Sequence, residues 1–218
     1  MKLNPSTGNM YDFVTHTGNA IKGKCPHGCF YCYMKQWKNQ KDVRLDESEL
    51  KGPMAEGNFI FIGSSCDMFA ENIPGEWIEK VLYYCGKFNN NYLFQSKNPE
   101  RFFDFGYPEL TVFCTTIETN RWYGKVMQDS PHPENRAMSM SKISGFKNYL
   151  TIEPIMDFDL DDFVSMIQAC NPDQVNIGAD SGGNKLPEPS VEKIMMLIKM
   201  LEGFTTIHRK TNLKRLLK

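Results

Sequence analysis

The segment Lys24-Cys-Pro-His-Gly-Cys-Phe-Tyr-Cys-Tyr33 places three cysteines within eight residues, in the spacing Cys-x3-Cys-x2-Cys. Its glycine and proline predict a loop rather than a regular element. Three thiols on one short loop suit a metal centre better than a disulfide framework. The chain has seven cysteines, an odd number, and the other four are single and widely spaced. We therefore expect a reduced protein that holds a metal centre on Cys25, Cys29 and Cys32.

Two kinds of metal centre suit this loop, an iron–sulfur cluster and a zinc ion. A [4Fe–4S] cluster with only three cysteine ligands leaves one iron open to bind a small molecule. A structural zinc ion takes four ligands, so His27 or His16 would have to complete the set. Neither spacing is a familiar zinc pattern, and the sequence has no second Cys-x2-Cys pair. The sequence therefore favours the cluster and keeps zinc as the alternative.

Short apolar runs that end in small or polar residues recur along the chain and predict buried strands. They cover residues 59–62, 92–94, 111–113, 149–152 and 175–177, with a weaker strand at about 12–17. Segments with the spacing of one helix face lie between several of them, over residues 77–85, 160–170 and 191–201. Strands that alternate with helices predict parallel β-α units. The expected fold is α/β, a partial (β/α)6 barrel of the TIM type with a parallel sheet.

Polar residues follow the predicted strands, at the end of the sheet where α/β folds carry their chemistry. The residues expected to face one cavity there are Ser64, Ser65, Asp67, Lys97, Glu118, Asn120, Glu153 and Gly178. A carboxylate at a strand end can bind a ligand or belong to a structural hydrogen-bond network, and a glycine can admit a ligand or serve the turn alone. Four aromatic residues near the same ends can stack on a planar substrate or simply pack: Trp37, Phe69, Trp122 and Tyr123.

Length and charge limit the remaining possibilities. The chain has 218 residues, of which 41% are apolar, and this favours a single domain over residues 1–218. The barrel core is expected at about 11–203, and a basic tail at 208–218 is either a solvated helix or a phosphate-binding segment. The formal net charge of -1 provides no global positive field, so nucleic acid would need a local patch. No apolar run is long enough for a membrane span, and the N-terminus lacks a secretory apolar stretch, which favours a cytoplasmic protein.

The order of motifs along the chain carries a family resemblance. The blocks are Val14-Thr-His-Thr17, the cysteine loop, Phe61-Ile-Gly-Ser-Ser-Cys-Asp-Met-Phe69, Phe94-Gln-Ser-Lys-Asn-Pro-Glu-Arg101, Thr116-Ile-Glu-Thr-Asn120, Leu150-Thr-Ile-Glu-Pro154 and Gly178-Ala-Asp-Ser-Gly-Gly183. Over about residues 11–185 the sequence resembles the radical S-adenosylmethionine (SAM) superfamily, and more closely small phage-associated members that are distantly similar to spore photoproduct lyase. An aromatic residue directly before the third cysteine, here Tyr31, distinguishes the radical SAM motif from other three-cysteine sites.

The resemblance implies a reaction and a cofactor set. A [4Fe–4S] cluster on Cys25, Cys29 and Cys32 would bind SAM at its open iron. An electron from an external donor such as flavodoxin or ferredoxin would then cleave SAM to methionine and a 5′-deoxyadenosyl radical. That radical would take hydrogen from the substrate, while the protein positions the substrate and excludes water.

The resemblance also suggests roles for the strand-end residues. Tyr31 would lie near the SAM adenine. The family's Gly-Gly-Glu-type motif is replaced here by Gly63-Ser-Ser-Cys-Asp67, so Ser64, Ser65 and Asp67 are the candidates to receive the methionyl amino group. Lys97 would pair with a carboxylate of SAM or substrate. Three acceptors would suit ribose hydroxyls or the SAM amine: Glu118, Asn120 and Glu153.

The expected substrate is a nucleotide or a DNA base, which would be modified, rearranged or repaired. Similarity to a lyase that repairs a thymine lesion and the basic tail both favour this class. A peptide or small metabolite is the alternative substrate. The alternative functions are a non-catalytic zinc module that binds nucleic acid, and a cluster protein that needs another subunit to complete its site.

Overall fold

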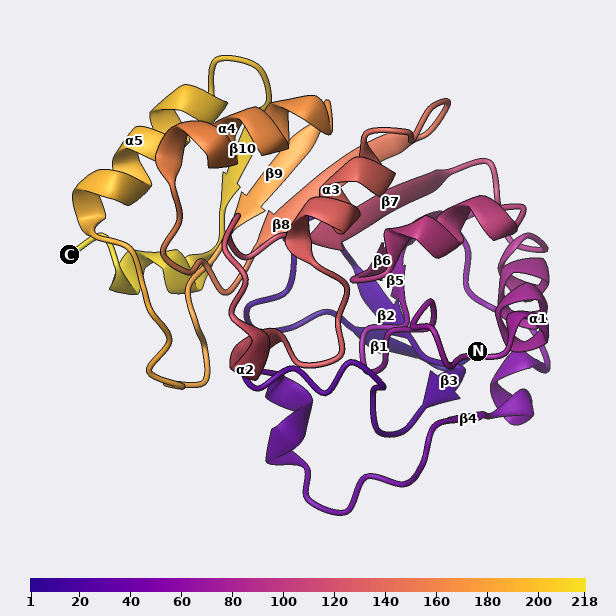
Figure 1. The fold of residues 1–218 in the computed structure, drawn as a ribbon. Helices are drawn as coiled ribbons and strands as arrows, with labels where there is room; N and C mark the ends of the chain where they lie inside the picture. Colours follow the sequence, from indigo (N-terminus) through magenta and orange to yellow (C-terminus); the bar gives the residue numbers. More distant parts are fainter.

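The computed structural model describes residues 1–218, and its centre is one eight-stranded sheet in the order β1-β2-β5-β6-β7-β8-β9-β10. The strands are β1 (Leu3–Pro5), β2 (His16–Gly18), β5 (Phe59–Ile62), β6 (Asn91–Ser96), β7 (Thr111–Thr116), β8 (Lys147–Ile152), β9 (Gln174–Ile177) and β10 (Thr206–Arg209). β1 pairs antiparallel with β2, and every other neighbouring pair is parallel. The expected α/β fold is confirmed, with a sheet that stays open between its edge strands β1 and β10 (Figure 1).

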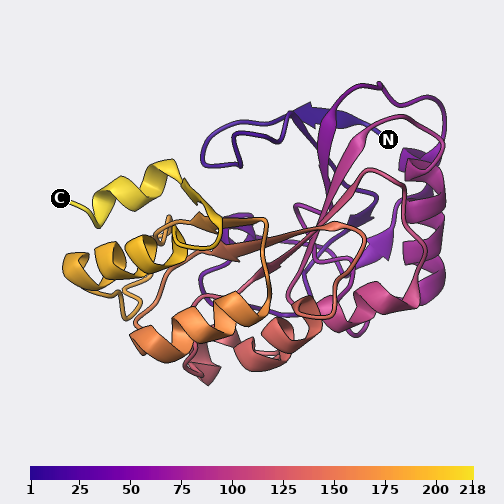
Figure 2. The ribbon, with the colours of Figure 1, turned by 90° about the horizontal axis from the view of Figure 1, so that it is seen from above.

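Helices connect the parallel strands and cover the outer side of the sheet (Figures 1 and 2). The α-helices are α1 (Gly75–Cys85), α2 (Gly124–Met127), α3 (Pro133–Met140), α4 (Leu160–Ala169) and α5 (Val191–Leu201). The 3-10 helices are η1 (Tyr33–Gln36), η2 (Glu47–Leu50), η3 (Pro99–Asp104) and η4 (Thr211–Arg215). Most residues of the predicted helix faces are buried: Ile78, Val81, Leu82 and Cys85 of α1 lie in the main core with Ile194, Ile198 and Leu201 of α5. Met195 of α5, predicted on the same face, is exposed, and Leu197 is buried instead.

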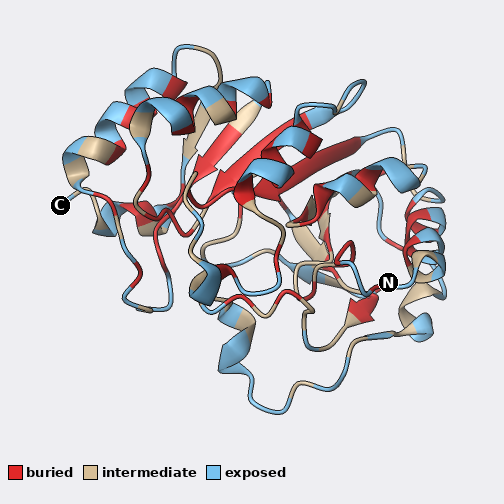
Figure 3. Ribbon diagram, in the orientation of Figure 1, coloured by how far each residue is buried: buried red, intermediate tan, exposed pale blue.

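The core lies between the sheet and these helices, so the sheet is the most buried part of the chain (Figure 3). Alternate apolar residues of the strands face it, as period-two geometry requires. Cys85, Cys114 and Cys170 are buried in apolar surroundings, where a free cysteine acts as a small hydrophobic side chain. No helix has the length and apolar character needed to cross a membrane.

A short antiparallel ribbon holds the base of the cysteine loop. β3 (Ile21–Lys22) pairs with β4 (Arg44–Leu45), and the Lys24 amide donates to the Lys41 carbonyl at 2.9 Å. Gly23 has φ +118°, and a Cβ there would lie 2.5 Å from the Asp42 carbonyl oxygen. Only glycine fits this crossing without strain. The cysteine loop and η1 therefore form the connection between β3 and β4, and the ribbon holds the two ends of this connection together.

The basic C-terminal segment is part of the fold. Thr206–Arg209 form β10, which pairs in parallel with β9 and adds a strand to the six that the sequence predicted. Lys210 is only 6% exposed and Leu213 is buried in the main core. The core therefore extends beyond its predicted end near residue 203. The many basic residues of this segment made it look like a solvated tail, although Ile207 and Leu213 are apolar.

Candidate functional site

A cavity of about 710 Å³ lies at the carboxyl ends of the parallel strands. Cys25, Cys29 and Cys32 all line it, although they come from the loop between β3 and β4 rather than from the main sheet. Five of the predicted ligand-binding residues line the same cavity: Tyr31, Ser64, Asp67, Lys97 and Glu153. The structure thus brings the cysteine loop and most of the strand ends together.

The three cysteines are free thiols that share this cavity. No group of three or more His, Cys, Asp or Glu side chains is gathered closely enough to hold a metal ion. Thiols along the wall of one cavity suit ligands that bind different irons of a cluster. The donor set therefore fits a three-cysteine cluster site.

Cys66, at the end of β5, lies against Cys25. The neighbouring Cys66 thiol lowers the pKa of Cys25, although burial alone would raise it. The same contact raises the pKa of Cys66. Burial raises the pKa of Cys29 and of Cys32. Since the thiolate is the metal-binding form, the loop contains one thiol that is already biased toward it.

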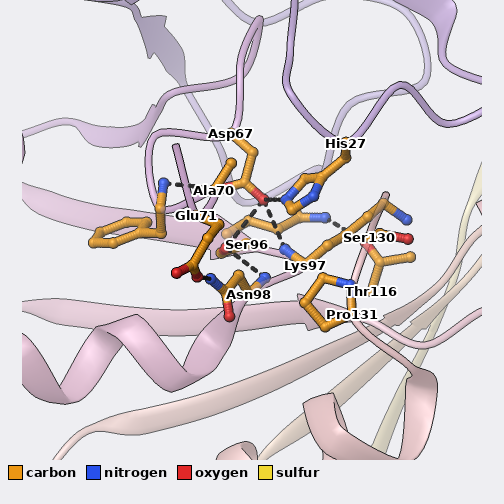
Figure 4. A network of polar contacts seen from close by, with 12 residues as sticks. His27, Asp67, Ala70, Glu71, Ser96, Lys97, Asn98, Thr116, Ser130 and Pro131 are labelled. Atoms are coloured by element: carbon orange, nitrogen blue, oxygen red, sulfur yellow. Dashed lines mark hydrogen bonds and ion pairs between the residues drawn. The ribbon is translucent and has the colours of Figure 1, made fainter. Parts of the chain in front are cut away.

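His27 ties the cysteine loop to the sheet. Its Nε2 lies 2.8 Å from Asp67 Oδ2, and the ring is buried between the loop and the end of β5 (Figure 4). The Asp129 amide also donates to the His27 carbonyl at 3.1 Å, and the Phe30 amide to the Val126 carbonyl at 2.8 Å. These contacts join the loop to β5 and to the end of α2.

Asp67 is the centre of a hydrogen-bond network rather than a free acceptor (Figure 4). Its carboxylate accepts from His27, from Ser96 Oγ at 3.0 Å and from the backbone amides of Phe69 and Lys97 at 3.0 and 2.8 Å. Burial would raise the pKa of Asp67, but His27 and the amides outweigh it and hold that pKa below the usual value. Asp67 therefore fixes the ends of β5 and β6 beside the cysteine loop.

Asn19 orders Ser64 and Ser65, the two serines that follow β5. Its Nδ2 donates to Ser64 Oγ at 3.1 Å, and its Oδ1 accepts from the amide and the hydroxyl of Ser65, both at 2.9 Å. Tyr33 Oη donates to the Ser64 carbonyl at 2.6 Å. Sequence reasoning missed Asn19, although its place directly after β2 makes it the tip of the first parallel strand.

Glu118 is fully buried behind the cavity wall, where it holds Lys97 and Tyr31. Lys97 Nζ and Tyr31 Oη both donate to Glu118 Oε1, and Arg136 Nη1 donates to Oε2 at 2.8 Å. Burial would raise the pKa of Glu118, but Arg136 and Lys97 lower it to about 2. Arg136 is also fully buried in α3, and no sequence pattern singled it out. Glu118 therefore positions two cavity residues instead of reaching the cavity itself.

Glu153 joins the two ends of the chain to the sheet. Its Oε1 accepts from Asn9 Nδ2 at 2.6 Å and from Asn212 Nδ2 at 2.7 Å, and its Oε2 accepts from Lys210 Nζ at 2.6 Å. A Cβ on Gly178 would lie 2.7 Å from Glu153 Oε1. Gly178 therefore makes room for the Glu153 carboxylate, and Lys210 brings a cation from the basic segment to the cavity.

Several of the other predicted residues lie apart from this cavity. Asn120 exchanges two hydrogen bonds with the backbone of Asp159, at 3.0 and 3.1 Å, and braces the loop before α4. Phe69 is buried among other aromatic rings and packs, while Trp122 lines a separate cavity of about 440 Å³ and stacks on His132. Of the four predicted stacking residues, Trp37 lines the main cavity.

Solved structures with the same fold are radical SAM enzymes. A single-site mutant of spore photoproduct lyase has a TM-score of 0.65 and 11% identity, over 94% of this chain and 79% of that one. A double mutant of the lyase with bound AdoMet and dinucleoside spore photoproduct has a TM-score of 0.65 and 10% identity, over 93% and 78%. Streptococcus suis SuiB bound to S-adenosylmethionine has a TM-score of 0.53 and 8% identity, over 88% and 49%.

The fold is thus that of the radical SAM enzymes, as the sequence predicted. Within that class of fold, the chain belongs to the family described as "Protein of unknown function (DUF5131)", whose model matches residues 10–190. No curated protein sequence matches the chain. The phage association stays a prediction.

Proposed function

We propose that the chain is a radical SAM enzyme that binds a [4Fe–4S] cluster on Cys25, Cys29 and Cys32 and acts on a nucleotide or a DNA base. The observation that carries this proposal is the position of the three cysteines. They line one cavity at the carboxyl ends of parallel strands, in a fold that is shared with proteins bound to SAM. When bound, the cluster supplies the electron that cleaves SAM to methionine and a 5′-deoxyadenosyl radical, which takes hydrogen from the substrate.

The size and lining of the cavity support a SAM site. A volume of about 710 Å³ is within the range of small-molecule sites, and its walls carry both apolar rings and a few fixed polar groups. Lys97 Nζ is a cation at the wall, held there by Glu118, and would pair with the SAM carboxylate. Tyr31, whose ring lies 5.0 Å from Lys97 Nζ, would border the adenine.

The amino group of SAM needs acceptors. Ser64 Oγ lies on the cavity wall and is oriented by Asn19, which makes it the better placed of the two serines. The Asp67 carboxylate also lines the cavity, but four hydrogen bonds already hold it. Asp67 would therefore act on SAM mainly by fixing the backbone and side chains around it.

The substrate class rests on chemistry at the cavity mouth and on one relative. The mouth carries an exposed indole at Trp37 and exposed amines at Lys24 and Lys35, groups that suit bases and phosphates. Spore photoproduct lyase, a structure of the same fold, binds a dinucleoside. The electron would come from an external donor such as flavodoxin or ferredoxin.

The test is anaerobic reconstitution with iron and sulfide, followed by reduction and addition of SAM. We expect a brown protein that forms 5′-deoxyadenosine, and a Cys29→Ala variant that does neither. Cys85→Ala is the matched control, because Cys85 is buried in α1 away from the cavity, and it should keep both properties. A colourless protein with one tightly bound zinc ion would overturn the proposal.

A further inference from the structure

The segment that carries the cysteine loop has a charge opposite to that of the rest of the chain. Residues 24–44 contain five exposed basic residues and one acidic residue, Asp42, whereas the whole chain has a formal net charge of -1. None of the five takes part in an ion pair, although the two other lysines that line the cavity, Lys97 and Lys210, both do. The five basic residues are Lys24, Lys35, Lys38, Lys41 and Arg44. Together with Tyr33 and Trp37 they are called the basic rim.

The fold gathers these charges instead of separating them. Lys22 lies opposite Arg44 in the β3–β4 ribbon, and the Lys24 amide donates to the Lys41 carbonyl at 2.9 Å. Lys22 is neutralised by two carboxylates, but Lys24 and Lys41 have no carboxylate partner. Like charges that lie close together repel each other, and an anion bound between them removes that repulsion. The rim is therefore suited to a polyanion.

Two exposed aromatic rings stand among these charges. Tyr33 is 52% exposed and Trp37 is 53% exposed, and their ring centroids lie 6.1 Å apart at an interplanar angle of 79°. Both rings line the mouth of the main cavity, as do Lys24 and Lys35. An exposed ring within a positive patch is the arrangement that stacks unpaired bases while lysines contact the phosphates.

From these features we infer that the basic rim binds single-stranded DNA and feeds one base into the cavity. Phosphates would lie against Lys24, Lys38 and Lys41, and a neighbouring base would stack on Trp37. Lys24 and Lys35 flank the cysteine loop in the sequence and line the same cavity as the three cysteines, so a strand held there would lie at the mouth of that cavity. The choice of DNA rests on the proposed function, whereas the choice of an anionic strand with unpaired bases rests on the rim itself.

The test measures binding of a fluorescent 12-nucleotide single-stranded DNA by anisotropy, with and without the reconstituted cluster. Trp37→Ala should weaken binding about tenfold, and Trp37→Phe should restore most of the affinity because it keeps a ring. Lys24→Glu with Lys41→Glu should lower the slope of log Kd against log salt by about 0.7 for each phosphate that is no longer bound.

The matched control is an exposed pair at the end of α1, where Lys87 Nζ lies 4.2 Å from the centre of the 72%-exposed Tyr83 ring. Tyr83→Ala with Lys87→Glu changes the same types of residue outside the cavity and should leave binding unchanged. Equal losses of affinity in the rim and control variants would overturn the inference. So would tighter binding of duplex DNA, of RNA of the same sequence, or of vesicles that contain anionic lipid.

The same proteins separate this inference from the proposed function. A wild-type protein that forms 5′-deoxyadenosine, together with rim variants that bind DNA poorly, supports both. A wild-type protein that binds DNA through the rim but forms no 5′-deoxyadenosine supports the rim and counts against the proposed function. A protein that forms 5′-deoxyadenosine but binds no single-stranded DNA supports radical SAM activity and overturns the inference that the basic rim binds DNA.

Discussion

Replacing Glu118 with glutamine tests the buried charge cluster behind the cavity. The change keeps the size of the side chain but leaves the fully buried Arg136 without its carboxylate and removes the partner of Lys97. The pKa of Glu118 falls from 4.5 to about 2, which corresponds to about 3 kcal/mol of stabilisation of the folded state. Removing one partner of a buried ion pair costs a similar amount, about 3–5 kcal/mol.

The effect of Glu118→Gln should depend on pH in a defined direction. A carboxyl group with a lowered folded pKa stabilises the protein above its unfolded pKa, and the stabilisation disappears as pH falls through the folded value. Glu118 should therefore contribute its full amount above about pH 4.5 and lose it between about pH 4.5 and 2.

Equilibrium unfolding in urea measures this contribution at each pH. At pH 7 we expect Glu118→Gln to lower the free energy of unfolding by about 3 kcal/mol, and the melting temperature by about 6–12 °C. The difference in the free energy of unfolding between wild type and Glu118→Gln should become smaller as the pH is lowered. Glu109→Gln, a change of the same kind at an exposed carboxylate, should stay within about 0.5 kcal/mol of wild type. A small effect at pH 7, or an effect that is the same at pH 7 and pH 3, would refute the reasoning.

Two further substitutions test single contacts at the site. Gly178→Ala should destabilise the fold by about 1–3 kcal/mol, because the added Cβ would lie 2.7 Å from Glu153 Oε1. Gly106→Ala is the control, because a Cβ at Gly106 would have no atom within 4 Å. Equal melting temperatures for the two variants would contradict the prediction. Lys97→Met should weaken SAM binding to the reconstituted, unreduced protein by about tenfold or more in calorimetry, because a charge-assisted hydrogen bond is removed. Lys87→Met should bind SAM like wild type, and an unchanged Kd in Lys97→Met would remove Lys97 from the SAM site.

Much of the fold could be predicted because its signals are local. Each predicted strand is a short apolar run, and each long helix repeats its apolar residues every three to four positions, so periodicity alone located β5 to β9, α1, α4 and α5. The parallel arrangement followed from the alternation of these elements. The cysteine spacing likewise needs only eight residues, and a resemblance to radical SAM enzymes could be recognised from it and the strand ends.

The contacts that shape the site were not predictable in this way. Glu153 meets Asn9, which is 144 residues away, and Lys210, which is 57 residues away. Sequence patterns give no sign of either partner, because a single polar residue in a loop has no periodicity. For the same reason Asn120, which follows a strand like the other candidates, turns to the loop before α4 instead of the cavity.

The sequence by itself therefore determined β5 to β9 with α1, α4 and α5, the parallel arrangement of these strands and the three-cysteine motif, whereas β1, β3, β4 and β10 became visible only in the structure. Only the tertiary structure decided which strand-end residues reach the cavity and which support it from behind. Asp67 and Glu118 carry charges that must be matched where they are buried, and their partners His27 and Arg136 come from segments that packing, not sequence proximity, brings beside them.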